Sequence, residues 1–174
     1  GKAISTREGN LIKLDELLAE AERRAYEIVK DRGGTHELAA QIGIGAVKYS
    51  DLSHDPITDI DFSWDKALAL EGNSGPYLQY AYARVCSLLE KSGKVEAWEG
   101  EKVSGKVEER EGGKVEEASG FGVVDPVEKR LALALLEFPG AVVRAAEAYK
   151  PSVLADYLFQ TAQLYSSFYQ NAPI

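Results

Sequence analysis

The chain has 174 residues, 45% of them apolar, and a formal net charge of −8, which favours a soluble globular protein, or a piece of one, with one or two domains. No apolar run approaches the roughly 20 residues that a membrane span needs, and residues 1–6 lack the apolar segment of a signal peptide, so we expect a cytoplasmic protein that contacts no membrane. The negative charge excludes nucleic-acid binding by bulk electrostatic attraction, because that mode normally requires a clustered positive face, and any contact with RNA must be local.

The N-terminal part of the chain predicts a loop and two helices. Residues 1–14 show no clear periodicity, which indicates a loop that enters a helix. An apolar stripe with helical spacing runs over residues 14–29, and the glycine pair at 33–34 ends this helix. Thr35 can cap a second helix that runs to about Tyr49. The small residues of this helix permit close approach of another backbone.

Residues 51–70 predict an irregular connector with one short extended piece at 62–64. Carboxylates and one imidazole gather there within eleven residues: Asp51, His54, Asp55, Asp59 and Asp61. Their spacing fits no established ligand pattern, and aspartate is common in turns and caps, so we expect no metal site. His36, beside the cap of the second helix, is expected at the surface.

A turn and a helix rich in aromatic and polar residues begin at residue 73. The segment reads Asn73-Ser74-Gly75-Pro76-Tyr77-Leu78-Gln79-Tyr80-Ala81-Tyr82-Ala83-Arg84. Ser74 can cap this helix and Pro76 fits its first turn, which spreads the tyrosines, Gln79 and Arg84 around a rigid element. Three tyrosines and one arginine so placed suit stacking on bases and binding of phosphate.

The alternative for this segment is a packing helix, because its apolar residues between 78 and 89 also recur at helical spacing and some tyrosines can join them in a core. The single cysteine, Cys86, stands within that pattern and has no second thiol to pair with. We expect it to be a small buried core residue.

A degenerate repeat follows the tyrosine-rich helix. One phrase occurs in three versions: Ser92-Gly93-Lys94-Val95-Glu96, Ser104-Gly105-Lys106-Val107-Glu108 and Gly112-Gly113-Lys114-Val115-Glu116. Copies this short and this charged cannot bury surface as solenoid repeats do, so residues 93–122 are expected to form a short irregular or hairpin insertion. A partner-docking strand is the alternative, although alternating Lys and Glu is usually a solvated face.

The C-terminal part predicts three more helices. Asp125 and Pro126 start a helix that ends at Phe138. A shorter helix follows from residue 139 to about residue 149, and the last one begins at residue 151 with a broad apolar and aromatic face. That face still needs partners where the sequence stops, which indicates a fragment.

Three segments, taken in their order and spacing, resemble arginyl-tRNA synthetase. They are residues 73–80 of the tyrosine-rich helix, Gly45-Ala46-Val47-Lys48-Tyr49-Ser50-Asp51-Leu52 and Lys150-Pro151-Ser152-Val153-Leu154-Ala155-Asp156-Tyr157-Leu158. Ile4-Ser5-Thr6-Arg7-Glu8-Gly9-Asn10 is similar to the signature loop of that class I family. The resemblance covers nearly the whole chain except the repeat insertion.

The resemblance implies a mainly α fold, a helical bundle of the class I synthetase anticodon-binding type. Residues 1–60 would be the end of a catalytic domain, with the signature loop and connecting helices. Residues 61–174 would be a C-terminally incomplete anticodon-binding domain that carries the insertion at 93–122.

The resemblance also implies an enzyme that activates arginine with ATP, with Mg²⁺ implied by the reaction, and then attaches arginine to tRNA(Arg). A class I signature loop closes on ATP and stabilises the charge that develops as pyrophosphate leaves. By resemblance, Ser5 and Thr6 offer donors to ATP, and Arg7 with Lys2 supplies positive charge. We expect a monomer.

The loop departs from the family pattern. Ala3 and Ile4 stand where the loop usually has lysine and methionine, Thr6 stands in the second lysine position, and Glu8 replaces a basic residue. These departures reduce the positive charge that the loop offers to phosphate.

By the same resemblance, side chains on the helices before and after the insertion would contact tRNA: Tyr77, Gln79, Tyr80, Arg84, Lys150, Tyr157 and Tyr169. The chain contains no His-Ile-Gly-His-like motif and no βαβ alternation, so we expect it not to activate arginine alone. The alternative is an autonomous, non-catalytic RNA-binding or protein-interaction module derived from the same helical domain.

Overall fold

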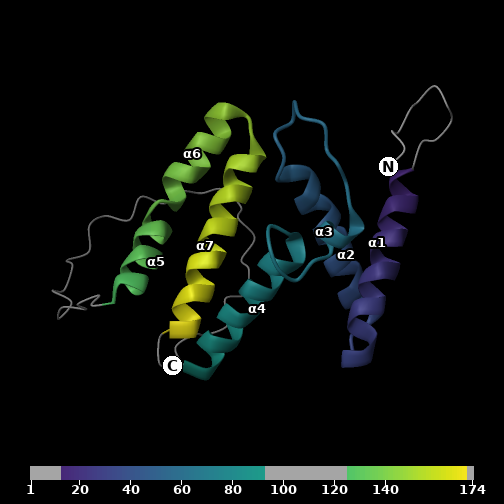
Figure 1. Ribbon diagram of the computed structural model, residues 1–174, viewed down its shortest axis with the longest axis horizontal. Helices are drawn as coiled ribbons and strands as arrows, with labels where there is room; N and C mark the ends of the chain where they lie inside the picture. Colours follow the sequence, from purple (N-terminus) through teal and green to yellow (C-terminus); the bar gives the residue numbers. More distant parts are fainter. Residues whose placement is uncertain (1–12, 93–124, 172–174) are drawn as a thin grey trace, which may run out of the picture.

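The computed structural model describes residues 13–92 and 125–171 of the chain. Within these two ranges every regular element is a helix, which confirms the mainly α fold (Figure 1). The signature-loop residues and the repeat insertion at 93–122 lie outside the described residues. No helix in the described ranges has the length and apolar character that crossing a membrane requires.

The first two helices form a hairpin. Helix α1 (Leu14–Val29) continues into the short 3-10 helix η2 (Lys30–Arg32), and Gly33 then turns the chain with a φ of 79°. Helix α2 (His36–Leu52) starts at Thr35, whose side chain accepts a hydrogen bond from the Leu38 backbone N–H. Small side chains let α1 and α2 pack closely over a core that includes Ala25 and Ala39.

The connector differs in part from the expected extended piece. Its backbone is extended at Ser63, but α3 (Trp64–Ala67) is a one-turn helix. The N–H of Ala67 bonds to the Ser63 carbonyl oxygen at 2.9 Å, and this turn buries Ala67 and Leu68. Burial of these two side chains favours the turn over a continued extended chain.

Four longer elements complete the fold: α4 (Gly75–Ser92), α5 (Pro126–Leu136), α6 (Phe138–Ala148) and α7 (Pro151–Asn171). Figure 1 shows α5 and α6 following one another along α7, while α4 lies between α7 and the α1–α2 hairpin. The caps predicted for α4 and α5 are confirmed, because Ser74 Oγ accepts from the Tyr77 N–H at 3.2 Å and Asp125 Oδ1 from the Val127 N–H at 2.6 Å.

Two single-residue predictions have different outcomes. Cys86 is half-buried and not a buried core residue, because it lies one turn beyond the exposed Tyr82 on the same flank of α4. His36 is exposed as predicted, and its ring stacks on Tyr26 with 3.9 Å between the centroids.

Candidate nucleic-acid interface

An arginine that lies over two tyrosine rings joins α4 to α7. The Arg84 guanidinium carbon lies 4.1 Å from the ring centroid of Tyr169 and 5.3 Å from that of Tyr80. Tyr80 precedes Arg84 by one helical turn, so both side chains leave the same face of α4. Because Tyr80 is 53% exposed and Tyr169 is 36% exposed, this stack keeps accessible aromatic surface beside a cation. We call these three residues the arginine stack.

The arginine stack has the chemistry that unpaired nucleotides require. An exposed ring offers a stacking surface to any base, and a guanidinium binds phosphate or stacks on a base. The rings also hold the guanidinium in place, since a cation over an aromatic face is attracted by the ring quadrupole. The arrangement therefore can bind a single-stranded segment locally.

Tyr165 lies next to the arginine stack and is 9% exposed. Its ring centroid is 6.1 Å from that of Tyr169, and its buried hydroxyl has no hydrogen-bond partner among the described residues. Burial raises the pKa of Tyr165, with a smaller opposing effect from Arg84. The sequence places Tyr165 on the apolar and aromatic face of the last helix, and its burial agrees with that prediction. Tyr165 was not among the predicted tRNA contacts, although its spacing of four residues from Tyr169 places both rings on one helix face.

Two of the predicted tRNA contacts on α4 are engaged in packing. The Tyr77 hydroxyl lies 3.3 Å from Ser166 Oγ, and its ring meets Phe159 edge-on at 5.7 Å. Gln79 donates from Nε2 to the Gln41 carbonyl oxygen at 3.1 Å, across the contact with α2. The packing alternative therefore describes the observed contacts of Tyr77 and Gln79, whereas Tyr80 stands outside the core.

Two more of the predicted contacts also have partners inside the protein. The Tyr157 hydroxyl donates to the Ala134 carbonyl oxygen at 2.9 Å. Lys150 pairs with Asp55, with 2.5 Å between Nζ and Oδ2, and this pairing lowers the pKa of the Asp55 carboxyl. The structure thus brings together only the residues of the arginine stack from the predicted set, and contact of any of these side chains with tRNA stays a prediction.

The predicted ATP contacts cannot be placed in the same way. Lys2, Ser5, Thr6 and Arg7 lie outside the described residues, so their arrangement carries no structural argument. Their assignment to ATP stays a prediction that rests on the resemblance.

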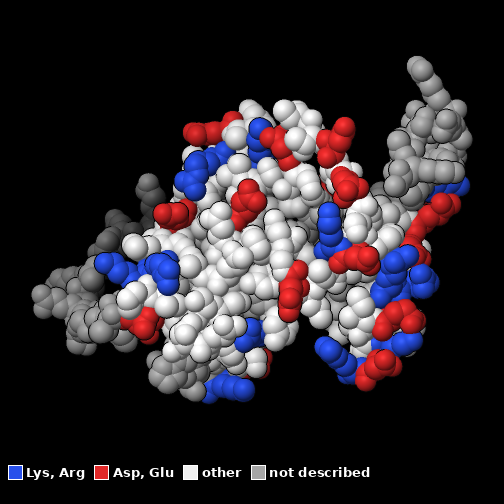
Figure 2. All heavy atoms as spheres, in the orientation of Figure 1, with Lys and Arg blue, Asp and Glu red and all other residues white. Residues whose placement is uncertain are grey.

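Charge on the surface is mixed. In Figure 2, Lys and Arg side chains lie among Asp and Glu around the edge of this face and over α1, while its middle is mostly uncharged. This face carries no continuous positive area among the described residues. The net charge of −8 agrees with this distribution. Attraction of RNA would therefore depend on local groups such as Arg84.

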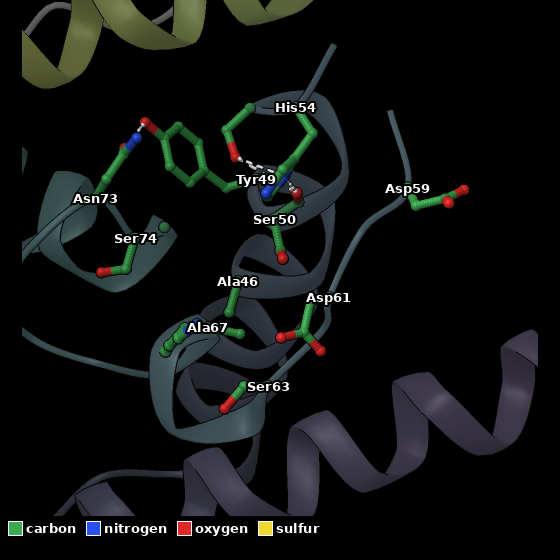
Figure 3. A pocket seen from close by; sticks show the side chains of 13 residues that line it. Ala46, Tyr49, Ser50, His54, Asp59, Asp61, Ser63, Ala67, Asn73 and Ser74 are labelled. Atoms are coloured by element: carbon green, nitrogen blue, oxygen red, sulfur yellow. Dashed lines mark hydrogen bonds between the residues drawn. The ribbon is translucent and has the colours of Figure 1, made fainter. Parts of the chain in front are cut away.

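A polar cavity of about 390 Å³ lies where the end of α2, the connector, α3 and the start of α4 meet (Figure 3). Part of the acidic cluster noted in the sequence lines this cavity. His54 Nδ1 lies 2.6 Å from the Ser50 carbonyl oxygen, so this ring nitrogen already has a hydrogen-bond partner. Figure 3 shows the carboxylates of Asp59 and Asp61 apart from each other. In the described ranges, no group of three or more His, Cys, Asp or Glu side chains is placed to hold a metal ion.

Two family models match separate parts of the chain. The model described as "DALR anticodon binding domain" matches residues 78–174. The model described as "tRNA synthetases class I (R), catalytic domain" matches residues 1–64. The arginine stack lies entirely within the first match.

The individual proteins to which the chain is similar are arginine–tRNA ligases. The chain is 41% identical to the arginine–tRNA ligase of Fusobacterium nucleatum subsp. nucleatum over 98% of its own length and 28% of that protein. It is 39% identical to the arginine–tRNA ligase of Chromobacterium violaceum over its full length, again 28% of that protein. The chain therefore spans little more than a quarter of these relatives.

Solved structures agree with the sequence comparison. The fold is similar to arginyl-tRNA synthetase from Thermus thermophilus, with a TM-score of 0.73, 36% identity and coverage of 94% of this chain and 25% of the other. It is also similar to arginyl-tRNA synthetase from Plasmodium falciparum, with a TM-score of 0.70, 25% identity and coverage of 92% and 27%. The resemblance seen in the sequence is thereby confirmed.

Proposed function

We propose that this chain, which belongs to the arginyl-tRNA synthetase family and contains its DALR anticodon-binding domain, binds the anticodon side of tRNA(Arg) for an arginine–tRNA ligase. The observation that carries the proposal is the arginine stack, in which Arg84 lies over the exposed rings of Tyr80 and Tyr169. These residues come from α4 and α7, both within the segment that the anticodon-binding model matches.

Stacking gives this site a route to RNA despite the acidic protein. A base on an aromatic side chain contributes about 1 to 3 kcal/mol, and the Arg84 guanidinium adds a charge-assisted contact with phosphate. Two such stacking contacts are enough to offset a modestly unfavourable net charge. The affinity should fall only slightly as the salt concentration rises, because only one or two positively charged side chains contact phosphate.

The wider activity is part of the same proposal. ATP, when bound, supplies the phosphoanhydride whose cleavage activates the arginine carboxylate, and Mg²⁺ would accompany it. Lys2, Ser5, Thr6 and Arg7 would hold the phosphates, and residues 1–60 would belong to the catalytic domain. We further propose a cytoplasmic monomer with arginine, ATP and tRNA(Arg) as its partners.

Fluorescence anisotropy with a labelled anticodon stem-loop of tRNA(Arg) tests the RNA-binding role. We expect measurable binding at low salt, and about tenfold weaker binding for Arg84→Ala or Tyr80→Ala, the loss expected for one stacking or charged contact. Arg144→Ala is the matched control, because it removes an exposed arginine on α6, away from the arginine stack.

Two results would count against the proposal. Equal affinity for stem-loops of unrelated tRNAs would contradict specific recognition and favour a general RNA-binding module. Equal weakening by Arg84→Ala and Arg144→Ala would show that net charge, and not the arginine stack, governs binding.

A further inference from the structure

The two helices that carry the arginine stack both rest on α2 at their N-terminal ends. Figure 1 shows the start of α4 beside α2, and α4 and α7 approach each other toward their C-terminal ends. Arg84 lies in the middle of α4, and Tyr169 lies in the last turn of α7. The separation of the two helices at the stack therefore depends on the direct contacts of Tyr77 with α7 and on how α2 holds the beginnings of both helices.

Tyr49, in the last turns of α2, contacts the beginnings of both helices. Its hydroxyl donates to Asn73 Oδ1 at 2.5 Å, just before α4, and lies 3.3 Å from the Ala155 carbonyl oxygen in α7. The Tyr49–Asn73 hydrogen bond is drawn in Figure 3. A phenol has one proton, so the two acceptors share a single donor and all three segments meet at one atom.

A second contact holds the same end of α7. Asp55, in the connector after α2, pairs with Lys150, the residue that immediately precedes Pro151 at the start of α7. The side chains are 30% and 40% exposed, so this ion pair is only partly screened by water. Asp55 Oδ1 also accepts from the Ile57 N–H at 3.2 Å, which fixes the carboxylate in its loop.

The beginning of α4 is held against α2 as well. Gln79 donates to the Gln41 carbonyl oxygen, and Gly75 lies in contact with the backbone of Gly45. Helix α4 therefore has its own attachment to α2, whereas the start of α7 is attached to α2 and the connector through Tyr49 and Lys150. Tyr77 also joins α4 directly to α7, at Phe159 and Ser166. Loss of the Tyr49 hydroxyl would remove the hydrogen bond that joins the start of α7 to α2.

We propose that Tyr49 and Asp55 are positioning residues for the arginine stack: they fix the start of α7 on α2 so that Tyr169 stays over Arg84. The expected effect on RNA affinity rests on the proposed function, whereas the expected effect on the position of Tyr169 over Arg84 does not. Attraction between a cation and a ring is significant within about 6 Å of the centroid, so an increase of about 2 Å in the separation of Arg84 and Tyr169 would remove that contact. The contact of Arg84 with Tyr80, on the same helix, would remain. Tyr49 and Asp55 lie in the segment that the catalytic-domain model matches.

The test is Tyr49→Phe, which keeps the ring and removes the hydroxyl, with two readouts. The first is the NMR signal of the Arg84 Nε–H group, which the ring currents of Tyr80 and Tyr169 displace in the intact stack. We expect this signal to move toward its position in a disordered peptide. The second is affinity for the anticodon stem-loop, which we expect to fall about threefold to tenfold, in line with the loss of one neutral hydrogen bond.

Tyr149→Phe is the matched control, because it also removes a phenol hydroxyl. The Tyr149 side chain is 88% exposed and its hydroxyl joins no two of the described helices. Asp55→Asn is the second variant, since it weakens the ion pair at the surface of the fold and avoids the partly buried Tyr49 site. We expect both readouts to change in Asp55→Asn and in Tyr49→Phe, and neither to change in Tyr149→Phe. Far-UV circular dichroism checks that each variant is folded.

The outcomes separate the two proposals. An unmoved Arg84 signal in both Asp55→Asn and Tyr49→Phe overturns the positioning role. A moved signal with unchanged stem-loop affinity overturns its link to RNA binding. Absence of stem-loop binding by the unmodified chain overturns the proposed function, while the Arg84 signal still decides the geometric part.

Discussion

Gly75 lies directly against the backbone of Gly45, where α4 begins beside α2. A Cβ atom on Gly75 would be 2.9 Å from the Gly45 carbonyl oxygen and 3.0 Å from Ala46 Cα. Both neighbours are backbone atoms within a helix, so neither can rotate away as a side chain would. The close approach of α2 and α4 therefore requires glycine at position 75.

From this contact we predict that Gly75→Ala destabilises the protein. Overpacking of a close contact costs about 1 to 3 kcal/mol, and the start of α4 must shift away from α2 to relieve it. Urea denaturation of the variant and the unmodified chain measures the difference in the free energy of unfolding.

Gly140→Ala, inside α6, is the control for this prediction. The nearest atom to its added Cβ would be Arg144 Nη1 at 3.2 Å, the end of a flexible side chain. Alanine is favoured over glycine within a helix by about 1 kcal/mol, so we expect Gly140→Ala to be neutral or stabilising. Similar losses in both variants would show that helix backbone effects, and not the contact with Gly45, explain the result.

The second prediction concerns Tyr77, whose hydroxyl faces Ser166 on α7. We expect Tyr77→Phe to reduce the free energy of unfolding by about 0.5 to 1.5 kcal/mol, the usual net value of one hydrogen bond. Its stem-loop affinity should stay near that of the unmodified chain, because the Tyr77 ring still packs against Phe159. Chemical denaturation and fluorescence anisotropy on the same samples provide both measurements.

A double-mutant cycle with Ser166→Ala isolates the contact. If the hydroxyl groups interact, the combined variant should lose less stability than the sum of the two single variants. Strictly additive losses would contradict the hydrogen bond. A loss of stem-loop affinity in Tyr77→Phe, with stability unchanged, would instead return Tyr77 to the set of direct RNA contacts.

The contrast between Tyr77 and Tyr80 shows what the sequence could predict. Caps depend on local chemistry, so Ser74 and Asp125 were correctly assigned from neighbouring residues, and the helix starts followed from them. The orientation of a tyrosine on α4 depends instead on which helices pack around it. Tyr77 faces Phe159 on α7, a contact that no local pattern in residues 73–84 encodes.

The same reason explains Lys150 and Tyr165. The partner of Lys150 is Asp55 in the distant connector, so a lysine that looked available for phosphate is held in an ion pair. Tyr165 belongs to the broad aromatic face predicted for the last helix, but its place beside Arg84 follows from the approach of α4 to α7. The family resemblance predicted the fold, whereas the side chains that stay accessible could be identified only from the way the helices pack.

The third prediction is a loss of stability at alkaline pH that depends on Tyr49. Burial, with a further contribution from Asp156, raises the pKa of Tyr49 from 10.0 to about 12. Between these two pH values the unfolded chain loses the phenol proton while the folded chain keeps it, so the unfolded state binds fewer protons and stability falls as pH rises. The stabilising contribution of the neutral phenol is complete below pH 10 and lost as pH passes through about 12.

Urea denaturation at a series of pH values from 8 to 12 measures this loss, roughly spanning the ordinary and the raised pKa. Tyr49→Phe has no proton to lose, so its stability curve should fall less steeply above pH 10 than that of the unmodified chain. Tyr165, whose pKa is also raised, leaves a residual slope in the variant. Parallel curves for Tyr49→Phe and the unmodified chain would show that Tyr49 is not held neutral at the junction of α2, α4 and α7.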